Sequence, residues 1–579
     1  MSVRAPRSIV RSCDRDLARA VFLILLVLYT ATFVGVPELP DGELEFQGTS
    51  ALARSGSLAL AGTPEAQLAA EHLARDPRPG ALPVRRGAGA RADRVYSWYG
   101  VGQAAAAVPL YAVGRSARWL LPEVEARHRA LGIDGHPASE YFEHVLVGWR
   151  NPLLGAATAA LLLLCARRLG CERKRAFWAA LAYGVTSFAW PQARSSLSDV
   201  QAAFWLLLAF HLLLRMREGF ERFELPRARV LLGLGGALGM ALLTRVAVLP
   251  ACLVVGAAAE VQLRAGFRAL RVSRWAQAQA RRTHTVWRAA AVLAGPFLAC
   301  VVVLLVTNAV RFGDALDPGY GRVLRGGFFG GDPLAGLAGL CVSPGRGLLW
   351  MAPLVVVAPL GLWRAWSDGL RLPCLVACGV LAACLAVAAP LRGWGGAWTY
   401  GPRYLLPALP FLWLGVARAF GTPRGSRAWR WVLLAGAAFG LVVQFPGTLV
   451  DHTTAQDLAV RTARDVWPLP DLPEEDAEAQ RFENMQWHWG FAAPWVHWRI
   501  LRRRAAGLGA DYPPHEIFGT GESASLASSG PRQHGFLHWA WVDARERLGL
   551  TVWPVGLVLL GLLGLGLWCA ARGFDEARG

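Results

Sequence analysis

Long apolar runs separated by short polar connections extend through the chain of 579 residues. Several of these runs approach or exceed the ~20 residues that a helix needs to cross a bilayer. The first run is followed by no A-x-A-like cleavage site, so we expect it to remain as an anchor helix. Together the runs predict about twelve spans, at residues 20–37, 145–165, 176–190, 198–214, 230–244, 246–262, 288–309, 347–363, 372–391, 404–418, 430–447 and 549–570.

Arginine is unevenly distributed among the connections that join these runs. If the N-terminus lies inside, every second connection is short and arginine-rich, as in ARRLGCERKR at 166–175 and RMREGFERFELPRAR at 215–229. The positive-inside rule predicts such connections on the cytoplasmic side. The same rule accounts for the net charge of +19 without a nucleic acid partner. The sequence therefore predicts an all-α polytopic membrane protein.

The opposite, extracytoplasmic face receives the two longest connections. A first loop covers about 38–144, and a second segment covers 448–548. Residues 96–121 in the first loop are apolar enough to span, but one more span would reverse every later connection, so we expect a helix along the outer interface. The predicted organisation is a transmembrane domain at 1–447, the outer segment at 448–548, and a last helix with a cytoplasmic tail at 549–579.

Three carboxylates follow the first span in the stretch LPDGELEF: Asp41, Glu43 and Glu45. Asp is a favoured N-cap, and acidic residues in the first turn of a helix are stabilised by the helix dipole. The same carboxylates suit a general base that accepts a proton from a hydroxyl or amine in an aqueous cleft. Helix capping and catalysis are equal alternatives for this stretch when it is taken alone.

Arginines also occur at the outer ends of predicted spans, where the positive-inside rule does not expect them. Arg245, Arg311, Arg346 and Arg403 all hold such positions, and several lie beside Gly or Pro. Each is open to two interpretations, because arginine snorkels from helix ends and guanidinium also clamps phosphate oxygens. Asp199, at the outer end of another span, either caps its helix or serves a site.

Aromatic residues and potential metal ligands on the outer face are less specific. The aromatic residues fit a membrane-interface belt and equally suit stacking on sugar rings; they are Trp98, Tyr99, Tyr320, Trp394, Trp398 and Tyr400. The cysteines, and the histidines His488 and His497, lack the spacing of a metal site. No metal and no cofactor is predicted.

The order of these motifs resembles that of the GT-C superfamily of integral-membrane glycosyltransferases, in particular its protein O-mannosyltransferase and lipid-A aminoarabinose transferase branch. The resemblance covers about 1–450. It rests on Asp41-Gly42-Glu43 with ALARSGSL downstream, YSWYGVGQAAAAVPLY at 96–111, SSLSD at 195–199, GALGMALLTR ending at Arg245, NAVRFGDALDPGY at 308–320, SPGRGLLW at 343–350, and WGGAWTYGPRYLLPALP at 394–410.

The resemblance implies a GT-C-like architecture and transfer of a sugar from a polyprenyl-phosphate donor, with inversion, on the extracytoplasmic face. Asp41 matches the acidic residue of the family's first loop, which implies a general base. Because Gly42 separates the two acids here, Glu43 stays an open alternative. The donor phosphate is expected on Arg245, Arg346 and Arg403. The expected substrate cleft takes in Asp199, Tyr96, Tyr99, Gln103, Arg311, Tyr320, Trp394 and Tyr400.

The implied partners are the lipid bilayer, the lipid-linked sugar donor, and a glycan, lipid or protein acceptor, with no nucleic acid. The implied location is a bacterial inner membrane, with residues 448–548 available to select the acceptor. The alternative is a polytopic transporter or lipid-linked-sugar flippase without transferase activity. Transporters place ionisable residues near the bilayer midplane, whereas the polar motifs here lie at the outer ends of the spans.

Overall fold

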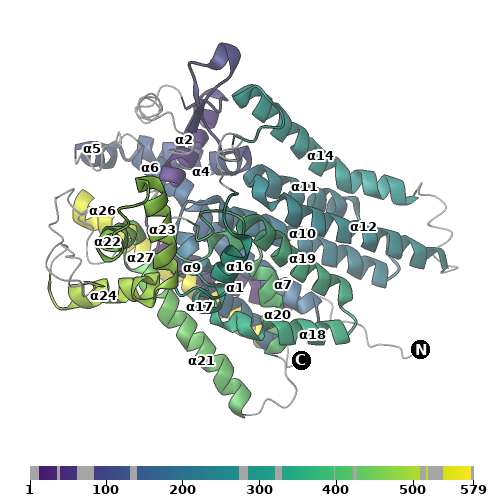
Figure 1. Cartoon of the computed structure of the whole chain (residues 1–579). Coiled ribbons are helices and arrows are strands. Elements are labelled where there is room, and N and C mark those ends of the chain that lie inside the picture. The colour runs from purple at the N-terminus through teal and green to yellow at the C-terminus, as the bar shows by residue number, and fades with distance from the viewer. Residues whose placement is uncertain are drawn as a thin grey trace.

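The protein is an almost entirely helical assembly (Figure 1). The computed structural model describes residues 12–35, 40–60, 84–130, 140–272, 285–319, 329–396, 398–420, 427–508, 517–518 and 539–575. Within these residues the strands form one hairpin, in which β1 (Val84–Arg86) pairs antiparallel with β2 (Val95–Ser97). The all-α prediction is therefore confirmed apart from this small hairpin.

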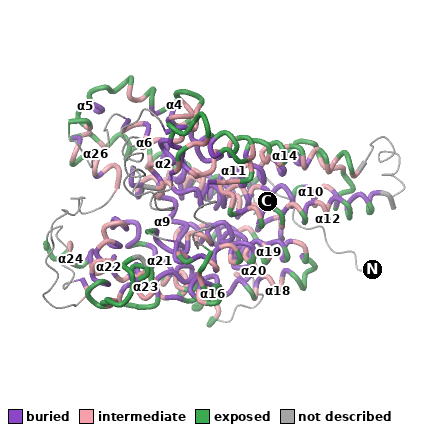
Figure 2. Tube along the Cα trace, turned by 45° about the horizontal axis from the view of Figure 1, so that its top comes forward, coloured by how far each residue is buried: buried purple, intermediate pink, exposed green. Residues whose placement is uncertain are grey.

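Long apolar helices form the bundle. They are α1 (Ser12–Ala31), α7 (Arg150–Arg168), α8 (Arg173–Thr186), α10 (Ser198–Glu221), α11 (Ala228–Thr244), α12 (Leu249–Val272), α14 (Thr285–Phe312), α19 (Arg371–Ala388), α20 (Leu409–Ala419), α21 (Arg427–Gln444) and α27 (Trp553–Asp575). Their inward faces share one large apolar core. In Figure 2 this core appears as the buried centre of the trace, while α14 is exposed along much of its length.

Seven helical segments in the described part of the chain are long and apolar enough to cross a membrane. They are Tyr141–Arg168, Ser198–Glu221, Val246–Leu270, Val286–Phe312, Arg371–Ala388, Arg427–Thr448 and Trp553–Asp575. Only 11% of the most apolar stretch of α14, and 17% of that of α27, is buried inside the protein. Apolar surface on this scale requires a lipid environment, so the chain is an integral membrane protein.

The predicted count of about twelve spans is not reached by these criteria. α8 and α20 are too short, and the N-terminal half of α1 carries several charged residues. The predicted span 347–363 is broken into α17 (Leu348–Met351), η4 (Pro353–Val357) and α18 (Ala358–Ser367). The break falls at Pro353 because proline has no backbone N–H to continue a helix.

The polar material gathers at one end of the bundle. The first loop contributes α2 (Pro40–Ser55), α4 (Val101–Leu120), α5 (Pro122–Ala130) and α6 (Tyr141–Gly148). The later segment contributes α22 (His452–Val466), α23 (Glu474–Trp487), α24 (Ala493–Ala505) and α26 (Ala540–Leu548). Figure 1 shows both groups on the left, whereas the end of α12 and the start of α14 lie far to the right. The two longest predicted connections therefore share a face.

The helix expected within residues 96–121 is present as α4, and it is not among the seven membrane-crossing segments. It packs on α2 and α6 and against the end of α11. The contact with α11 is close, because a Cβ on Gly102 would lie 2.7 Å from the carbonyl carbon of Leu243. α4 thereby holds α2 against the bundle.

The segment at 448–548 is joined to the bundle by backbone and side-chain hydrogen bonds. The indole N–H of Trp541 donates to the carbonyl of Ala31 at 2.8 Å, and the backbone N–H of Ala540 donates to the carbonyl of Phe33 at 2.7 Å. The following helix, α27, packs along α1. Residues 539–575 are thus docked on α1, the helix that precedes the first loop, and on the residues that follow it.

Close packing of α18 on α20 depends on small residues, as is usual between membrane helices. A Cβ added at Gly361 would lie 1.8 Å from the carbonyl oxygen of Gly415. We therefore expect Gly361→Ala to lower the stability of the detergent-solubilised protein by about 1–3 kcal/mol, measured as thermal unfolding. Gly564→Ala on α27 is the matched control, since no described atom lies within 4 Å of its added Cβ. Equal losses of thermal stability in both variants would contradict the role of Gly361 in the close packing of α18 on α20.

Candidate functional site

Charged side chains from six separate parts of the chain meet where the outer helices cover the bundle. We call this set the charged cluster, and its members are Asp41, Glu45, Arg150, Asp199, Arg245, Arg346 and Arg403. The three arginines predicted to hold phosphate and the predicted base Asp41 are all members. The sequence positions of the members span residues 41 to 403, so only the fold brings them together.

Helix α2 sorts the three carboxylates of the first loop by its periodicity. Asp41 and Glu45 are four residues apart and share one face. Glu43 lies on another face, where it accepts a hydrogen bond from Gln47 at 2.7 Å and contacts the Nε2 atom of His144 at 3.1 Å. The structure therefore places Asp41 in the charged cluster and Glu43 outside it.

Asp41 forms an ion pair with Arg403, the first residue of η5 (Arg403–Leu405). The Nη1 atom of Arg403 lies 3.4 Å from the Oδ2 atom of Asp41. The Asp41 side chain is 27% exposed, so solvent and substrate can reach it. Asp41 also occupies the first turn of α2, where the helix dipole favours a carboxylate. Asp41 therefore lies inside α2, after its first residue Pro40, and not at the predicted N-cap position, and its charge can stabilise the helix while its side chain belongs to the charged cluster.

Asp199 and Arg245 form the second ion pair, with Nη1 and Oδ1 2.9 Å apart. Asp199 lies inside the first turn of α10 and is fully buried, and the N-cap position belongs to Leu197. Arg245 follows the end of α11 and keeps 20% of its side chain exposed. Asp199 thus serves as a buried partner that fixes an accessible guanidinium.

Tyr404 links the two ion pairs. The guanidinium carbon of Arg245 lies 5.3 Å from the centroid of the Tyr404 ring, and that of Arg403 lies 5.2 Å from it. Burial acts to lower the pKa of Arg403, but Tyr404, Asp199 and Asp41 outweigh this effect and raise that pKa. Arg403 therefore stays charged, and the Tyr404 ring brings the guanidinium groups of both arginines into one site.

Glu45 is the buried acid of the charged cluster. It accepts a hydrogen bond from the side-chain amide of Gln103, which also donates to the carbonyl of Ser196 at 2.8 Å. Arg150 donates to the same carbonyl at 2.9 Å. Burial raises the pKa of Glu45 well above its ordinary value, and Asp41 and Asp199 raise it further against the opposing charge of Arg150.

The raised pKa of Glu45 predicts a pH dependence of stability. A carboxyl whose pKa is higher in the folded state stabilises the fold fully below its ordinary pKa, and this contribution is lost as the pH rises through the raised value. We therefore expect the melting temperature of the wild type to fall with rising pH more steeply than that of Glu45→Gln, which does not titrate. Parallel curves from mildly acidic to alkaline pH would contradict this expectation.

Arg346 reaches the cluster from the connection between α16 (Pro333–Val342) and α17. It is almost completely buried, and its Nε atom donates to Gln486 at 3.1 Å. Its Nη2 atom donates to Gln456 at 3.4 Å. Burial and the nearby charge of Arg403 lower the pKa of Arg346. Residues 448–548 thus supply two polar partners of a predicted phosphate-binding arginine.

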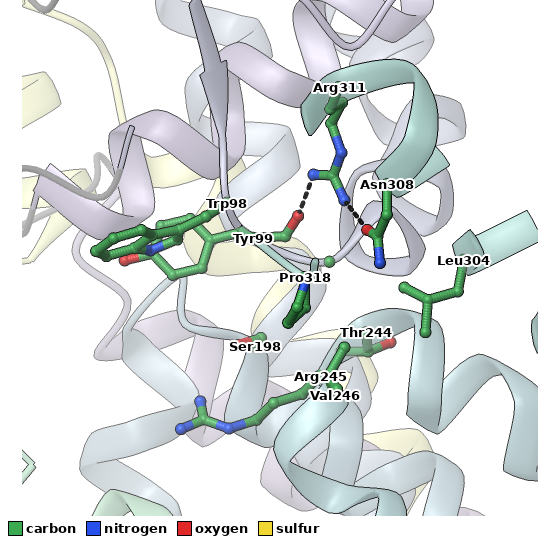
Figure 3. Close-up of a pocket in the computed structure, with 11 residues that line it drawn as sticks. Trp98, Tyr99, Ser198, Thr244, Arg245, Val246, Leu304, Asn308, Arg311 and Pro318 are labelled. Atoms are coloured by element: carbon green, nitrogen blue, oxygen red, sulfur yellow. Dashed lines mark hydrogen bonds between the residues drawn. The ribbon is translucent and has the colours of Figure 1, made fainter. Parts of the chain in front are cut away.

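Arg311 lies beside the charged cluster and is committed to the backbone. Its Nη1 atom donates to the carbonyls of Tyr99 at 2.9 Å and Ser97 at 3.0 Å, and its Nη2 atom donates to Asn308 at 3.1 Å. Figure 3 shows the bonds to Tyr99 and Asn308 at the edge of a small cleft that Arg245 also lines. The guanidinium of Arg245 points away from Arg311 (Figure 3). Arg311 is therefore placed to hold the first loop in position.

The predicted aromatic residues divide between cleft and core. Tyr99 and Trp98 line the cleft of Figure 3. Tyr96, in β2, is buried in a small apolar cluster, and the ring of Trp394 packs directly over Gly339. Tyr400 is buried, and its hydroxyl donates to the carbonyl of Val443. Tyr320 lies outside the described residues.

The sequence interpretation did not single out Tyr404 or His452, and it named Glu45 and His497 without giving either a role of its own in the site. The two histidine rings contact each other through Nδ1 and Nε2 at 3.1 Å, and both rings pack against Tyr400. Burial lowers the pKa of His497 to about 4. The spacing of Glu45 from Asp41 was the one available signal, because it places both acids on one helical face.

In the described part of the chain, no group of three or more His, Cys, Asp or Glu side chains is arranged to hold a metal ion. The ten cysteines are all free thiols, and most are buried among apolar residues.

Comparison with known proteins yields a distant similarity in fold. No protein-family model and no curated protein matches the sequence. Among solved structures, the chain is similar to the apo oligosaccharyltransferase of Archaeoglobus fulgidus, with 11% identity and a TM-score of 0.40 over 80% of this chain and 59% of that one. The oligosaccharyltransferase AglB of the same organism, in complex with an inhibitory peptide and a dolichol-phosphate, gives the same identity and TM-score over 82% and 59%. The chain thus spans less than two thirds of these enzymes.

Proposed function

We propose that the protein is a membrane glycosyltransferase of the GT-C type, which moves a sugar from a polyprenyl-phosphate donor to an acceptor on the extracytoplasmic face. The observation that carries this proposal is the meeting of Asp41 with Arg245, Arg346 and Arg403 in one site. A carboxylate beside several guanidinium groups can accept a proton and stabilise a departing phosphate.

The charge balance of the cluster favours an anionic substrate. Four guanidinium groups, including that of Arg150, face three carboxyl groups. The raised pKa of Glu45 favours its neutral form, which increases the surplus of positive charge. Guanidinium groups bind phosphate oxygens in bidentate geometry. A lipid phosphate that approaches from the bilayer would therefore neutralise the site.

The proposed reaction is a single displacement with inversion. Asp41 accepts the proton of the acceptor hydroxyl, whose oxygen attacks the anomeric carbon of the sugar. The bond from that carbon to the phosphate oxygen breaks, and its electron pair leaves with the polyprenyl phosphate. Arg403 and Arg245 would stabilise this developing charge, since both keep part of their side chains exposed.

Transfer and transport make different demands on the same cluster. Arg245 follows the end of α11, Arg403 precedes α20, and Asp199 lies in the first turn of α10. These are helix ends, whereas transporters concentrate ionisable groups near the bilayer midplane. The distribution of charge therefore favours transfer over the alternative of a transporter or flippase.

The test is an assay of purified protein in proteoliposomes that contain polyprenyl-phosphate hexoses or pentoses. We expect release of polyprenyl phosphate together with a glycosylated acceptor from a cell-envelope extract. Movement of the intact lipid-linked sugar across the bilayer, with no release of polyprenyl phosphate from any donor, would contradict the proposal and support the flippase alternative.

A further inference from the structure

A second cavity lies within the segment at 448–548, outside the charged cluster. It encloses about 530 Å³ between α22 and α23, within the ~300–1,000 Å³ range of small-molecule sites. The lining residues that matter for its chemistry are Trp398, Asp457, Arg461, Arg464, Glu478 and Phe482. We call this cavity the α22–α23 groove.

The groove combines an aromatic surface with paired charges. Trp398 is 36% exposed, and Phe482 lines the same cavity. Asp457 forms an ion pair with Arg461 at 2.9 Å, and Glu478 pairs with Arg464 across the two helices. The groove therefore offers hydrogen-bond donors, hydrogen-bond acceptors and an apolar ring face side by side.

We propose that the α22–α23 groove binds a neutral saccharide of the acceptor. Sugar hydroxyls both donate and accept hydrogen bonds, so they match adjacent guanidinium and carboxylate groups. The apolar face of a sugar ring suits an exposed tryptophan, which presents a large rigid surface. An anionic ligand fits less well, because Asp457 and Glu478 already neutralise two of the lining arginines.

Three residues of the groove are joined along the chain to residues of the charged cluster or to their hydrogen-bond partners. Gln456, which accepts a hydrogen bond from Arg346, precedes Asp457 in α22. Gln486, the other partner of Arg346, follows Met485 in α23. Trp398 belongs to the connection that leads into Arg403. A saccharide in the groove would therefore lie next to the site of transfer, and its role as acceptor rests on the proposed function.

The direct test measures binding of maltopentaose, mannopentaose and chitopentaose to the full-length protein by calorimetry. We expect at least one of them to bind, and Asp457→Asn and Glu478→Gln each to weaken that binding about tenfold. Both side chains are more than two fifths exposed, so their replacement spares the fold. The control is Asp465→Asn, an exposed acid of α22 that does not line the groove.

Three outcomes would overturn the groove assignment. They are binding of none of the three saccharides, binding that neither variant weakens, and displacement of the bound saccharide by a serine- and threonine-rich peptide. The proposed function is tested separately by release of polyprenyl phosphate. Saccharide binding without release of polyprenyl phosphate would support the groove proposal and contradict the transferase proposal. Release of polyprenyl phosphate without saccharide binding would support the transferase proposal and contradict the groove proposal.

Discussion

Replacement of Asp41 by Asn is expected to lower the rate of sugar transfer by about 10²–10⁴-fold, the usual contribution of a general base. The amide keeps the size of the side chain and can still accept a hydrogen bond from Arg403, but it cannot take up the acceptor proton. Affinity for the donor should change little, since the arginines stay in place. The measurement is the initial rate of polyprenyl phosphate release under saturating donor.

Glu43→Gln provides the matched control for this experiment. Glu43 belongs to the same helical turn, but its side chain is less exposed than that of Asp41, at 12% against 27%, and it faces His144 rather than the charged cluster. We expect its replacement to leave the rate within about threefold of wild type, as is usual for sites away from the chemistry. A large loss in Glu43→Gln with full activity in Asp41→Asn would reverse the assignment of the base.

Replacement of Arg403 by Gln is expected to lower kcat/KM by about 10²–10³-fold, comparable with the loss of one preorganised donor from an active site. Arg403 pairs with Asp41, contacts Tyr404 and acts electrostatically on Arg346. Its loss removes positive charge where the leaving phosphate would develop negative charge. Steady-state kinetics at several donor concentrations separates this effect from weaker donor binding.

Arg392→Gln is the corresponding control, because Arg392 is exposed and belongs to the same outer connection as Arg403. A general effect of outer-face charge on lipid attraction would weaken both variants alike, and it would do so less at high salt. An effect confined to Arg403→Gln, and insensitive to salt, supports a direct contact with phosphate. Equal losses would remove Arg403 from the site.

Part of this architecture could be predicted because membrane insertion imposes strong sequence rules. The long apolar runs predicted the helices of the bundle. The arginine-rich connections predicted the cytoplasmic side, so the two longest connections were predicted to lie together on the opposite side. In the structure α2 ends at Ser55, and Gly56 follows with φ +63°, a conformation that favours glycine. The break at Pro353 was missed because apolar content alone does not report a helix interruption.

The candidate site was predictable in its residue types and less so in its geometry. Arg245, Arg346 and Arg403 were selected because arginine on the outer face lies where the positive-inside rule does not expect it. Asp41 was selected because a carboxylate there suits a general base and matches the first-loop acid of the resembled family. The phase of α2, which separates Glu43 from Glu45, needs the exact start of a helix, and boundaries are the least certain part of a sequence pattern. Arg150 falls inside the predicted span 145–165, and only the tertiary packing brings it close to Glu45.

The two glutamines that hold Arg346 have a consequence for protein engineering. Gln456 and Gln486 belong to the segment that contains the α22–α23 groove, while Arg346, which they orient, belongs to the bundle. If the proposed function holds, a chimera that takes this segment from another protein in order to change the acceptor would have to preserve both amides where the segment meets the bundle. The outer segment and the bundle therefore depend on each other through the Arg346 contacts, and we expect that neither can be replaced without regard to the other.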